Sequence, residues 1–231
     1  MSRFRRLSYI LVPIALGIGS AALAQTPPTP TELAAYRDLH AAAARGDVAE
    51  IRRLAAAGVD LNARDGNGRT PLHVAAFLDQ PDAARALLAA KADPALLDGQ
   101  RYDAVTIAAV RDDAPMVRIL LEHGASAKLI TSVYDGTALI AAAHLGHDGV
   151  VKELIRGAAP LDHVNNLGWT ALIEAVILGN GGPRHVETVR ALVQAGANVN
   201  IADRQGVTPL QHARSRGYAA MIKILEGAGV R

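Results

Sequence analysis

The sequence predicts an all-α repeat solenoid of stacked helix-turn-helix units, with a turn between one unit and the next. Two observations predict it. Leu or Val recurs at positions 39, 72, 105, 139, 172 and 210, in steps of 33 or 34 residues except for a last step of 38. Each recurrence lies in a short Ala-rich stretch, and in most units a glycine followed by an Asn- or Asp-rich stretch comes after it. A constant step of this size indicates one supersecondary unit that buries its apolar face against copies of itself.

Each unit begins with a turn and a short first helix. In the second unit, Gly68 to Pro71 predict a turn followed by a helix start, because a proline at the first helical position gives up an N–H group that has no partner there. We expect this helix over residues 72–78. Its small Ala side chains would let paired helices approach closely.

A second helix follows in each unit, as over residues 83–88, and is expected to end at glycine. Gly58, Gly124 and Gly196 stand at this end in three units. Glycine is the residue that most easily adopts the left-handed conformation of a helix C-cap. An Asn- or Asp-rich stretch then leads to the next turn.

Three units depart from this pattern. Lys91 stands where the second helix usually ends in glycine, and Asp79 and Asp112 replace the glycine between the two helices. Arg101 replaces the glycine of the turn before unit three. Left-handed geometry at such a residue costs about 1 kcal/mol, so we expect units two and three to deviate and to open first. Unit five carries an insertion at residues 180–185, whose Gly-Gly-Pro sequence predicts an exposed loop between its helices.

These motifs resemble the ankyrin repeat family. The stretches that carry the resemblance are Thr70-Pro71-Leu72-His73-x-Ala75-Ala76, Ala142-Ala143-x-x-Gly146-His147-x-x-Val150-Val151-x-x-Leu154 and Ala195-Gly196-Ala197-Asn198-Val199-Asn200. The resemblance covers residues 33–231 and implies about six L-shaped units, each with two antiparallel helices and a β-turn finger, stacked into a curved solenoid. It also implies that the inner helices and fingers form a concave face, which binds other proteins in most family members. Family membership implies no catalysis.

Residues 1–24 are predicted to be a signal peptide. A basic segment over residues 3–6 precedes an apolar stretch over residues 7–21, and a small-x-small cleavage site lies between Ala24 and Gln25. The apolar stretch is short for a membrane span, and the alternative is an uncleaved N-terminal anchor. The Ala- and Gly-rich composition indicates a bacterial source. The prediction is therefore export to the periplasm, with no stable membrane anchor after cleavage.

Residues 25–32 are rich in proline and threonine and are predicted to be a stiff linker, so that the repeat domain is expected over residues 33–231. The whole chain has 24 basic and 22 acidic residues. Removal of residues 1–24 takes three arginines with it and leaves 21 basic residues, a net charge of −1. A near-neutral chain without a run of Lys or Arg argues against nucleic acid or an anionic membrane as the main partner.

The residues that catalysis would need are missing. The chain has no cysteine, which excludes disulfides, thiolate zinc sites and cysteine nucleophiles. Only three serines follow residue 24, at positions 126, 132 and 215, and none lies in a nucleophile-elbow pattern. Gly66-x-Gly68 is too short for a dinucleotide-binding loop. We predict that the protein is not an enzyme and needs no cofactor.

The histidines offer an alternative function, a metal or small-ligand binding protein. His144 and His147 are three residues apart and could share one side of a helix, and His185 could join them. However, Gly146 interrupts the pair, and His147 stands where the ankyrin pattern itself commonly has histidine. The favoured interpretation is a hydrogen bond that stabilises the turn, so no metal site is predicted.

The resemblance also indicates which positions face a partner: the two after the Ala-Ala pair of each first helix, and the finger positions before that helix. Aromatic anchors contribute much of the binding energy of protein interfaces. Where soluble repeats normally carry polar residues, ten of these positions are apolar or aromatic and form the predicted partner-binding site: Phe77, Leu78, Tyr102, Val110, Tyr134, Leu145, Leu167, Trp169, Ile177 and Leu178. Four arginines are expected to form a polar rim around it: Arg45, Arg69, Arg111 and Arg216.

The sequence thus predicts a non-catalytic protein-protein interaction module of the bacterial periplasm, which binds another protein through its concave face. Two alternatives stay open. The apolar row could pack internally along the inner helices without a partner, an objection that is strongest for Phe77, Ile177 and Leu178. The row could also join two copies of the chain in a homodimer.

Overall fold

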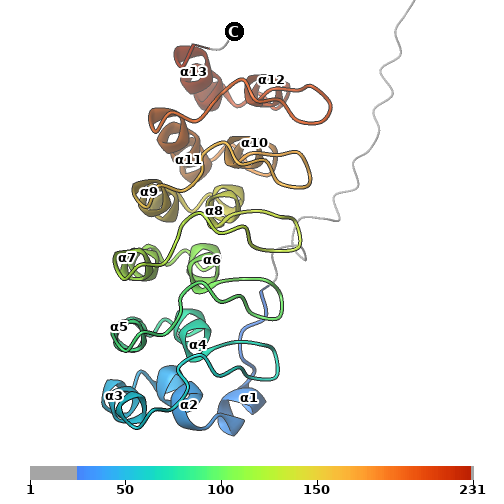
Figure 1. Ribbon diagram of the computed structural model, residues 1–231. Helices are drawn as coiled ribbons and strands as arrows, with labels where there is room; N and C mark the ends of the chain where they lie inside the picture. The colour runs from blue at the N-terminus through green and yellow to red at the C-terminus, as the bar shows by residue number, and fades with distance from the viewer. Residues whose placement is uncertain (1–24, 230–231) are drawn as a thin grey trace, which may run out of the picture.

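The structure of the protein, a computed structural model, describes residues 25–229 (Figure 1). Within this range the chain forms helices joined by turns and loops, without a β-strand, so the predicted all-α fold class is confirmed. None of the helices in residues 25–229 is long and apolar enough to cross a membrane. The predicted signal peptide, residues 1–24, lies outside the described residues.

A short helix, α1 (Pro30–Ala35), precedes six helix pairs, one for each predicted unit. The pairs are α2 (Asp38–Arg45) and α3 (Val48–Ala56), α4 (Pro71–Phe77) and α5 (Pro81–Ala89), α6 (Ala104–Val110) and α7 (Ala114–Glu122), α8 (Ala138–Leu145) and α9 (Asp148–Arg156), α10 (Ala171–Ile177) and α11 (Pro183–Gln194), and α12 (Pro209–Ser215) and α13 (Ala219–Gly227).

The helix pairs stack in two columns (Figure 1). The first helices of the pairs pack on one another as an inner column, and the second helices pack as an outer column. Five finger loops connect each outer helix to the next inner helix and project on the side of the inner column. Each finger is numbered here with the unit that follows it. We call the surface formed by the inner column and the fingers the inner face. A single hydrophobic core runs through all six units.

The inner helices begin where the repeat motif predicts. In unit two, the helix expected over residues 72–78 is found within one residue of that range. In four units a threonine caps the helix, because its side-chain oxygen accepts a hydrogen bond from the N–H group three residues later; these are Thr70, Thr137, Thr170 and Thr208. Asp103 takes this place in unit three and accepts from the N–H group of Thr106 (2.9 Å).

The left-handed positions also lie where the sequence predicts them. The glycines that end three outer helices, Gly58, Gly124 and Gly196, have φ angles of 78°, 92° and 94°. The four residues that replace glycine in units two and three keep the same conformation, with φ of 79° at Lys91, 51° at Asp79, 62° at Asp112 and 66° at Arg101. Units two and three therefore keep the left-handed geometry at these positions. The backbone there is strained, because each of the four residues has a Cβ atom. That these units open first stays a prediction.

Glycine at two left-handed positions that lack it, Lys91 and Ala158, should stabilise the protein. Ala158 follows α9 with φ of 57°, so it too is left-handed. We expect Lys91→Gly and Ala158→Gly each to raise the free energy of unfolding by about 1 kcal/mol, because this conformation is strained for a residue with a Cβ atom. Urea denaturation measures the change. Ala90→Gly is the control: Ala90 has φ of −77°, and glycine there should lower stability. An equal gain at position 90 would contradict the explanation.

The insertion of unit five joins three units together. The predicted loop covers residues 180–185, but α11 begins at Pro183. Residues 183–185 are therefore helical, and that part of the prediction is wrong. A proline is well suited to the first helical position. Arg184 donates to both carboxylate oxygens of Asp112 in unit three (2.8 and 2.7 Å) and to Asp148 in unit four (3.4 Å). The contacts of the stack are therefore not confined to neighbouring units.

Residues 25–32, predicted to be a linker, lie against the repeats. Thr29 caps α1, since its hydroxyl accepts from the N–H group of Glu32 (3.2 Å) and the Glu32 carboxylate accepts from the N–H group of Thr29 (2.7 Å). Pro28 is buried. A proline-rich composition indicates that a segment is stiff, but it does not show whether a surface exists for it to pack on. In this structure the segment therefore packs on the repeats and does not extend away from them.

Candidate interaction surface

Two of the ten predicted site residues have no surface to offer a partner. Phe77 and Tyr102 are buried in the core, with 2% and 4% of their surface exposed. Both rings belong to the core cluster that also contains the small Ala side chains of the inner helices, and large rings help such a core to reach close packing. Their assignment to an exposed binding site is therefore wrong. The same holds for Arg69 of the predicted rim, which is 1% exposed.

The other eight predicted residues reach the surface to different degrees. Six of them are half-buried: Leu78, Val110, Tyr134, Leu145, Trp169 and Ile177. Leu167 in the finger of unit five and Leu178 at the end of α10 are each 37% exposed. Internal packing, the alternative that the sequence left open, thus accounts for Phe77 but not for Leu178. Partner binding by these eight residues stays a prediction.

The sequence analysis missed three exposed apolar residues. Ile130, Val133 and Val164 are 48%, 62% and 46% exposed and lie in the fingers of units four and five. Together with Leu167 they form what we call the finger patch. A signal was present in the sequence for Leu167, which stands five residues before the recurring Leu or Val, where the fingers of units two, three and six carry Asn67, Gln100 and Gln205.

Hydrogen bonds hold the two fingers of this patch side by side. The backbone N–H of Asn166 donates to the carbonyl oxygen of Tyr134 (2.9 Å), and its side-chain amide donates to the carbonyl oxygen of Val133 (3.0 Å). Within the finger of unit five, Oδ1 of Asn165 accepts from the N–H groups of Leu167 and Trp169 (3.0 Å each). The apolar side chains therefore sit on tips whose backbones are already fixed.

A buried carboxylate ties the finger of unit five to the inner column. Glu174 in α10 is 3% exposed, and its two oxygens lie 3.1 Å from Nδ1 of His144 in α8 and 2.9 Å from the side-chain amide of Asn165. A buried carboxylate is tolerated when hydrogen bonds replace its water. Because Asn165 also organises the finger tip, this chain of contacts fixes the finger relative to two inner helices.

The histidines do not meet in one cluster. Nδ1 of His147 lies 2.9 Å from the carbonyl oxygen of Ala109, and Nε2 of His185 lies 3.0 Å from that of His144. No group of three or more His, Asp or Glu side chains that could hold a metal occurs in residues 25–229. The contact between His147 and Ala109 joins units four and three, in keeping with the favoured interpretation of a structural hydrogen bond.

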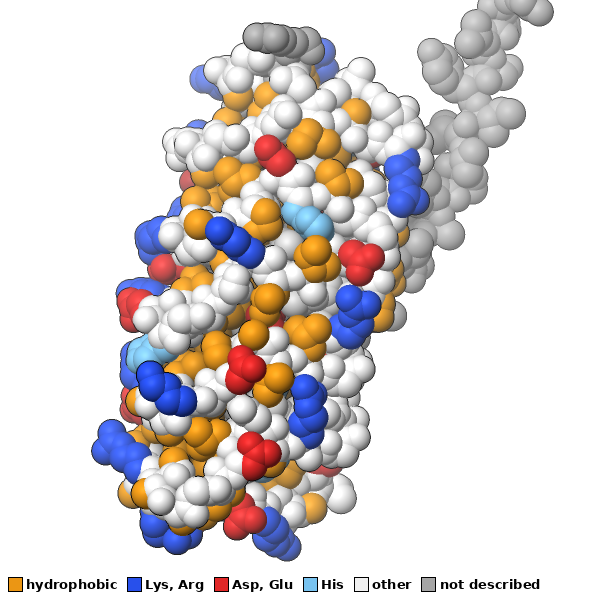
Figure 2. Space-filling model, viewed as in Figure 1, with side chains coloured by type: hydrophobic (Ala, Val, Ile, Leu, Met, Phe, Trp, Pro, Cys, Tyr) orange, Lys and Arg blue, Asp and Glu red, His pale blue; other side chains and the backbone are white. Residues whose placement is uncertain are grey.

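On the face seen in Figure 2, apolar side chains lie singly or in small groups along the middle of the stack. Lys and Arg side chains lie toward both edges of this view, and acidic side chains interrupt the apolar ones. Charged side chains of both signs are thus interspersed, and no field of one sign covers this face, which agrees with the near-neutral charge of the chain after residue 24.

Comparison with known proteins places the fold in a family. Residues 39–88 match the family described as "Ankyrin repeats (many copies)", and residues 91–161 and 147–230 match "Ankyrin repeats (3 copies)". The ankyrin repeat protein YahD of Escherichia coli K12 is 33% identical over 189 residues, which are 81% of this chain and 94% of YahD.

Solved structures are also similar to the chain in sequence and fold. An ankyrin repeat domain from Acinetobacter baumannii AYE is 44% identical with a TM-score of 0.79, over 84% of this chain and 98% of that one. One chain in the complex of the predatory endopeptidase Bd0816 from Bdellovibrio bacteriovorus with the immunity protein Bd3460 is 25% identical with a TM-score of 0.68, over 83% of this chain and 98% of that one. With the paired helices, the fingers and these matches, the chain belongs to the ankyrin repeat family.

Proposed function

We propose that the protein is a non-catalytic binding module of the bacterial periplasm, and that it binds another protein through the inner face of units four and five. The observation that carries the proposal is where the exposed apolar side chains lie. In residues 25–229, all the large apolar residues that are exposed belong to these two units: Ile130, Val133, Val164, Leu167 and Leu178. Exposed apolar residues gathered in one region are typical of protein interaction sites.

The surroundings of the finger patch favour a protein partner. Tyr134 and Trp169 lie half-buried in the same two fingers and add aromatic surface. Because hydrogen bonds already fix both finger tips, a partner would order little of the backbone on binding, which favours affinity. Ankyrin repeats are generally protein-protein interaction modules, and one similar chain comes from a complex of an endopeptidase with an immunity protein.

Site-specific photo-cross-linking in cells tests the proposed surface. A photoreactive amino acid at Val133 or Leu178 is expected to capture a specific protein. The same group at Arg85, half-exposed on the outer helix α5, is the control and should capture none. Capture of a second copy of the chain would replace the proposal with a homodimer. Equal capture at all three positions, or none, would contradict it.

A charged substitution tests whether the finger patch is the surface that binds the partner. We expect Val133→Asp together with Leu167→Asp to lower the affinity of the captured partner at least tenfold, because two carboxylates would have to lose water at the interface. The urea midpoint should stay unchanged, since both side chains are exposed in the free protein. Titration of the purified partner measures the affinity, and unchanged binding would exclude the finger patch.

The periplasmic location rests on residues 1–24 and has its own test. Intact-mass analysis of the protein from a periplasmic extract is expected to show a chain that begins at Gln25. A chain that keeps residues 1–24 and sediments with membranes would favour the uncleaved anchor.

A further inference from the structure

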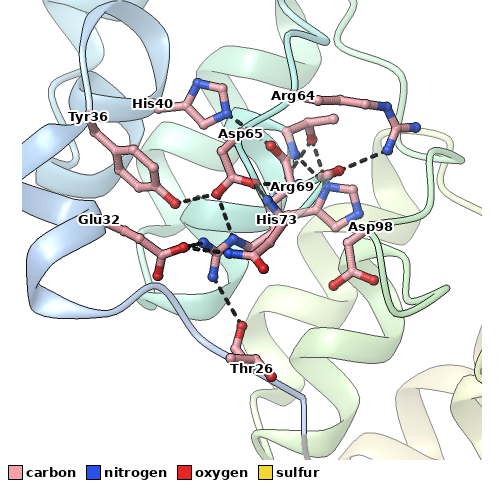
Figure 3. Close-up of polar contacts among 12 residues, drawn as sticks. Thr26, Glu32, Tyr36, His40, Arg64, Asp65, Arg69, His73 and Asp98 are labelled. Carbon is pink, nitrogen blue, oxygen red and sulfur yellow. Dashed lines mark hydrogen bonds and ion pairs between the residues drawn. The ribbon is translucent and has the colours of Figure 1, made fainter.

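The first described residues of the chain cross the fingers of units two and three (Figure 3). We call residues 25–35 the strap; they comprise an extended segment and α1. The backbone N–H of Thr26 donates to the side chain of Gln100 in the finger of unit three (2.9 Å). The carbonyl oxygen of Thr26 accepts from Nη1 of Arg69 in the finger of unit two (3.2 Å). Pro28 is the buried residue between these contacts and α1.

Glu32 makes the second anchor of the strap. Its carboxylate accepts hydrogen bonds from Nη2 of Arg69 and from the side-chain amide of Asn67, both in the finger of unit two. Hydrogen bonds from Thr29, and then from Arg69, hold the pKa of Glu32 below its usual value, so it is a carboxylate at neutral pH. The strap thus presents a backbone carbonyl and a carboxylate to one guanidinium.

The finger itself holds Arg69 ready for these two groups. Nε of Arg69 donates to Oδ2 of Asp65 (2.7 Å), and the backbone N–H of Arg69 donates to Oδ1 of the same residue (2.9 Å). Tyr36 steadies Asp65 in turn, because its hydroxyl donates to Oδ2 (2.6 Å). One edge of the guanidinium is therefore fixed within the repeats, and its two Nη groups point toward the strap (Figure 3). A guanidinium that is fixed in this way is suited to a carboxylate or carbonyl ligand.

A buried cation is peculiar to this finger. The residue before the helix cap is Arg69 in unit two, whereas it is Tyr102, Trp169 and Val207 in units three, five and six. The repeat itself does not require an arginine at this position. Its presence coincides with the place where the strap crosses.

The strap is held mostly by polar groups near the surface. No residue of α1 is buried, and the side chain of Glu32 is 29% exposed. A cavity of about 350 Å³ lies between Thr26 and the two finger tips and is lined by Asn67, Asp98 and Gln100 among others. Apart from the buried Pro28, the strap therefore lies at the surface, and it does not fill the space that it crosses.

We propose that the surface around Arg69, on the fingers of units two and three, is a peptide-binding site whose ligand in this structure is the chain's own strap. The site fits a segment that is extended at a proline and then turns into a helix whose first turn carries a carboxylate, four residues after the proline, as Pro28 and Glu32 are placed in the strap. A partner segment with this chemistry displaces the strap. This site is separate from the finger patch, so its test needs no identified partner.

The attachment of the strap sets the conditions for the test. A ligand joined to its site by a short segment has an effective concentration on the order of millimolar. A free peptide therefore competes poorly with the strap in the unaltered protein, and binds well only after the strap is weakened. The dependence of peptide binding on the strap is the property to measure.

The probe is a fluorescein-labelled synthetic peptide with the sequence of residues 25–36, added to protein purified from cells that express the full chain. We expect it to bind a Pro28→Gly/Glu32→Gln double variant at least tenfold more tightly than the unaltered protein. Adding Arg69→Gln to the double variant should abolish binding. Binding that is absent in the double variant, or equal in all three proteins, overturns the proposal. Circular dichroism checks that each variant is folded.

A spin label on the strap reports whether added peptide displaces the strap when its contact residues are unaltered. Because the chain has no cysteine, Thr31→Cys provides a single labelling site on the exposed side of α1. The label should be restricted in the absence of peptide and become mobile when millimolar peptide is added. A peptide with Gln in place of its glutamate is the control and should leave the label restricted. A label that stays restricted with both peptides means that the strap is a permanent part of the fold and excludes the proposal.

Discussion

Phe77→Ala is expected to lower the free energy of unfolding by about 3–5 kcal/mol, the usual effect of removing a buried phenylalanine ring. Phe77 is 2% exposed and belongs to the core that joins the units. Its removal leaves a cavity in this core. Urea denaturation followed by circular dichroism measures the loss. Since the core runs through all units, we expect the whole transition to move to lower urea.

The control for this variant is Leu178→Ala. Leu178 also follows the Ala-rich stretch of an inner helix, but it is 37% exposed, so truncation should change stability by less than about 1 kcal/mol. The pair separates the two roles that the sequence analysis assigned to one set of residues. If both variants had equally small effects on unfolding, Phe77 would not be a core residue and the burial described above would be wrong.

Asp103→Thr is expected to stabilise the protein at pH 8 by about 3 kcal/mol. Threonine caps four of the other inner helices, and in unit three the structure places an aspartate at the same buried position. Burial, opposed in part by hydrogen bonds from Thr106, raises the pKa of Asp103 from 3.8 to about 6. Each unit of such a shift corresponds to about 1.4 kcal/mol between the two protonation states. Thermal unfolding at several pH values measures the effect.

The pH dependence has a definite direction. Because the pKa of Asp103 is higher in the folded than in the unfolded chain, the folded protein binds the proton more tightly between pH 3.8 and about 6. The contribution of Asp103 to stability is therefore highest below pH 4 and falls as the pH rises through 6. The advantage of Asp103→Thr should be small at pH 4 and complete by pH 8. Asp47→Thr, at the half-buried cap of the outer helix α3, controls for the loss of a carboxylate cap. An advantage of equal size at pH 4 and pH 8 would contradict the assignment to ionisation.

The local features of the repeat could be predicted because they depend on residues close together in the chain. A threonine three residues before a helical N–H, a proline at the first helical position and a glycine at a left-handed C-cap each act within one turn. The same pattern marked four positions that glycine usually occupies: Lys91, Asp79, Asp112 and Arg101. Units two and three were expected to deviate there, but the structure keeps the left-handed conformation at all four positions. The insertion was located, but its second half was assigned to the loop, since the contacts of Arg184 with units three and four could not be known.

The candidate surface was predicted in outline and not in detail. The inner face followed from the family resemblance, and Leu167 and Leu178 are exposed on it. Burial of Phe77 and Tyr102 depends on how much space the neighbouring repeat leaves, which a single repeat sequence does not contain. Exposure of Val133 depends on how the finger of unit five lies beside that of unit four.

The sequence by itself determined the repeat, its period, the starts and ends of most helices and the family. These follow from spacing and from short-range hydrogen bonding, both of which are written along the chain. The tertiary structure alone decided which apolar side chains are core and which are surface, and that residues 25–32 lie across two fingers. The strap contacts join Thr26 to Arg69 and to Gln100, which are 43 and 74 residues away. Such contacts depend on the stacking of several units in space, and no local pattern in the sequence encodes that arrangement.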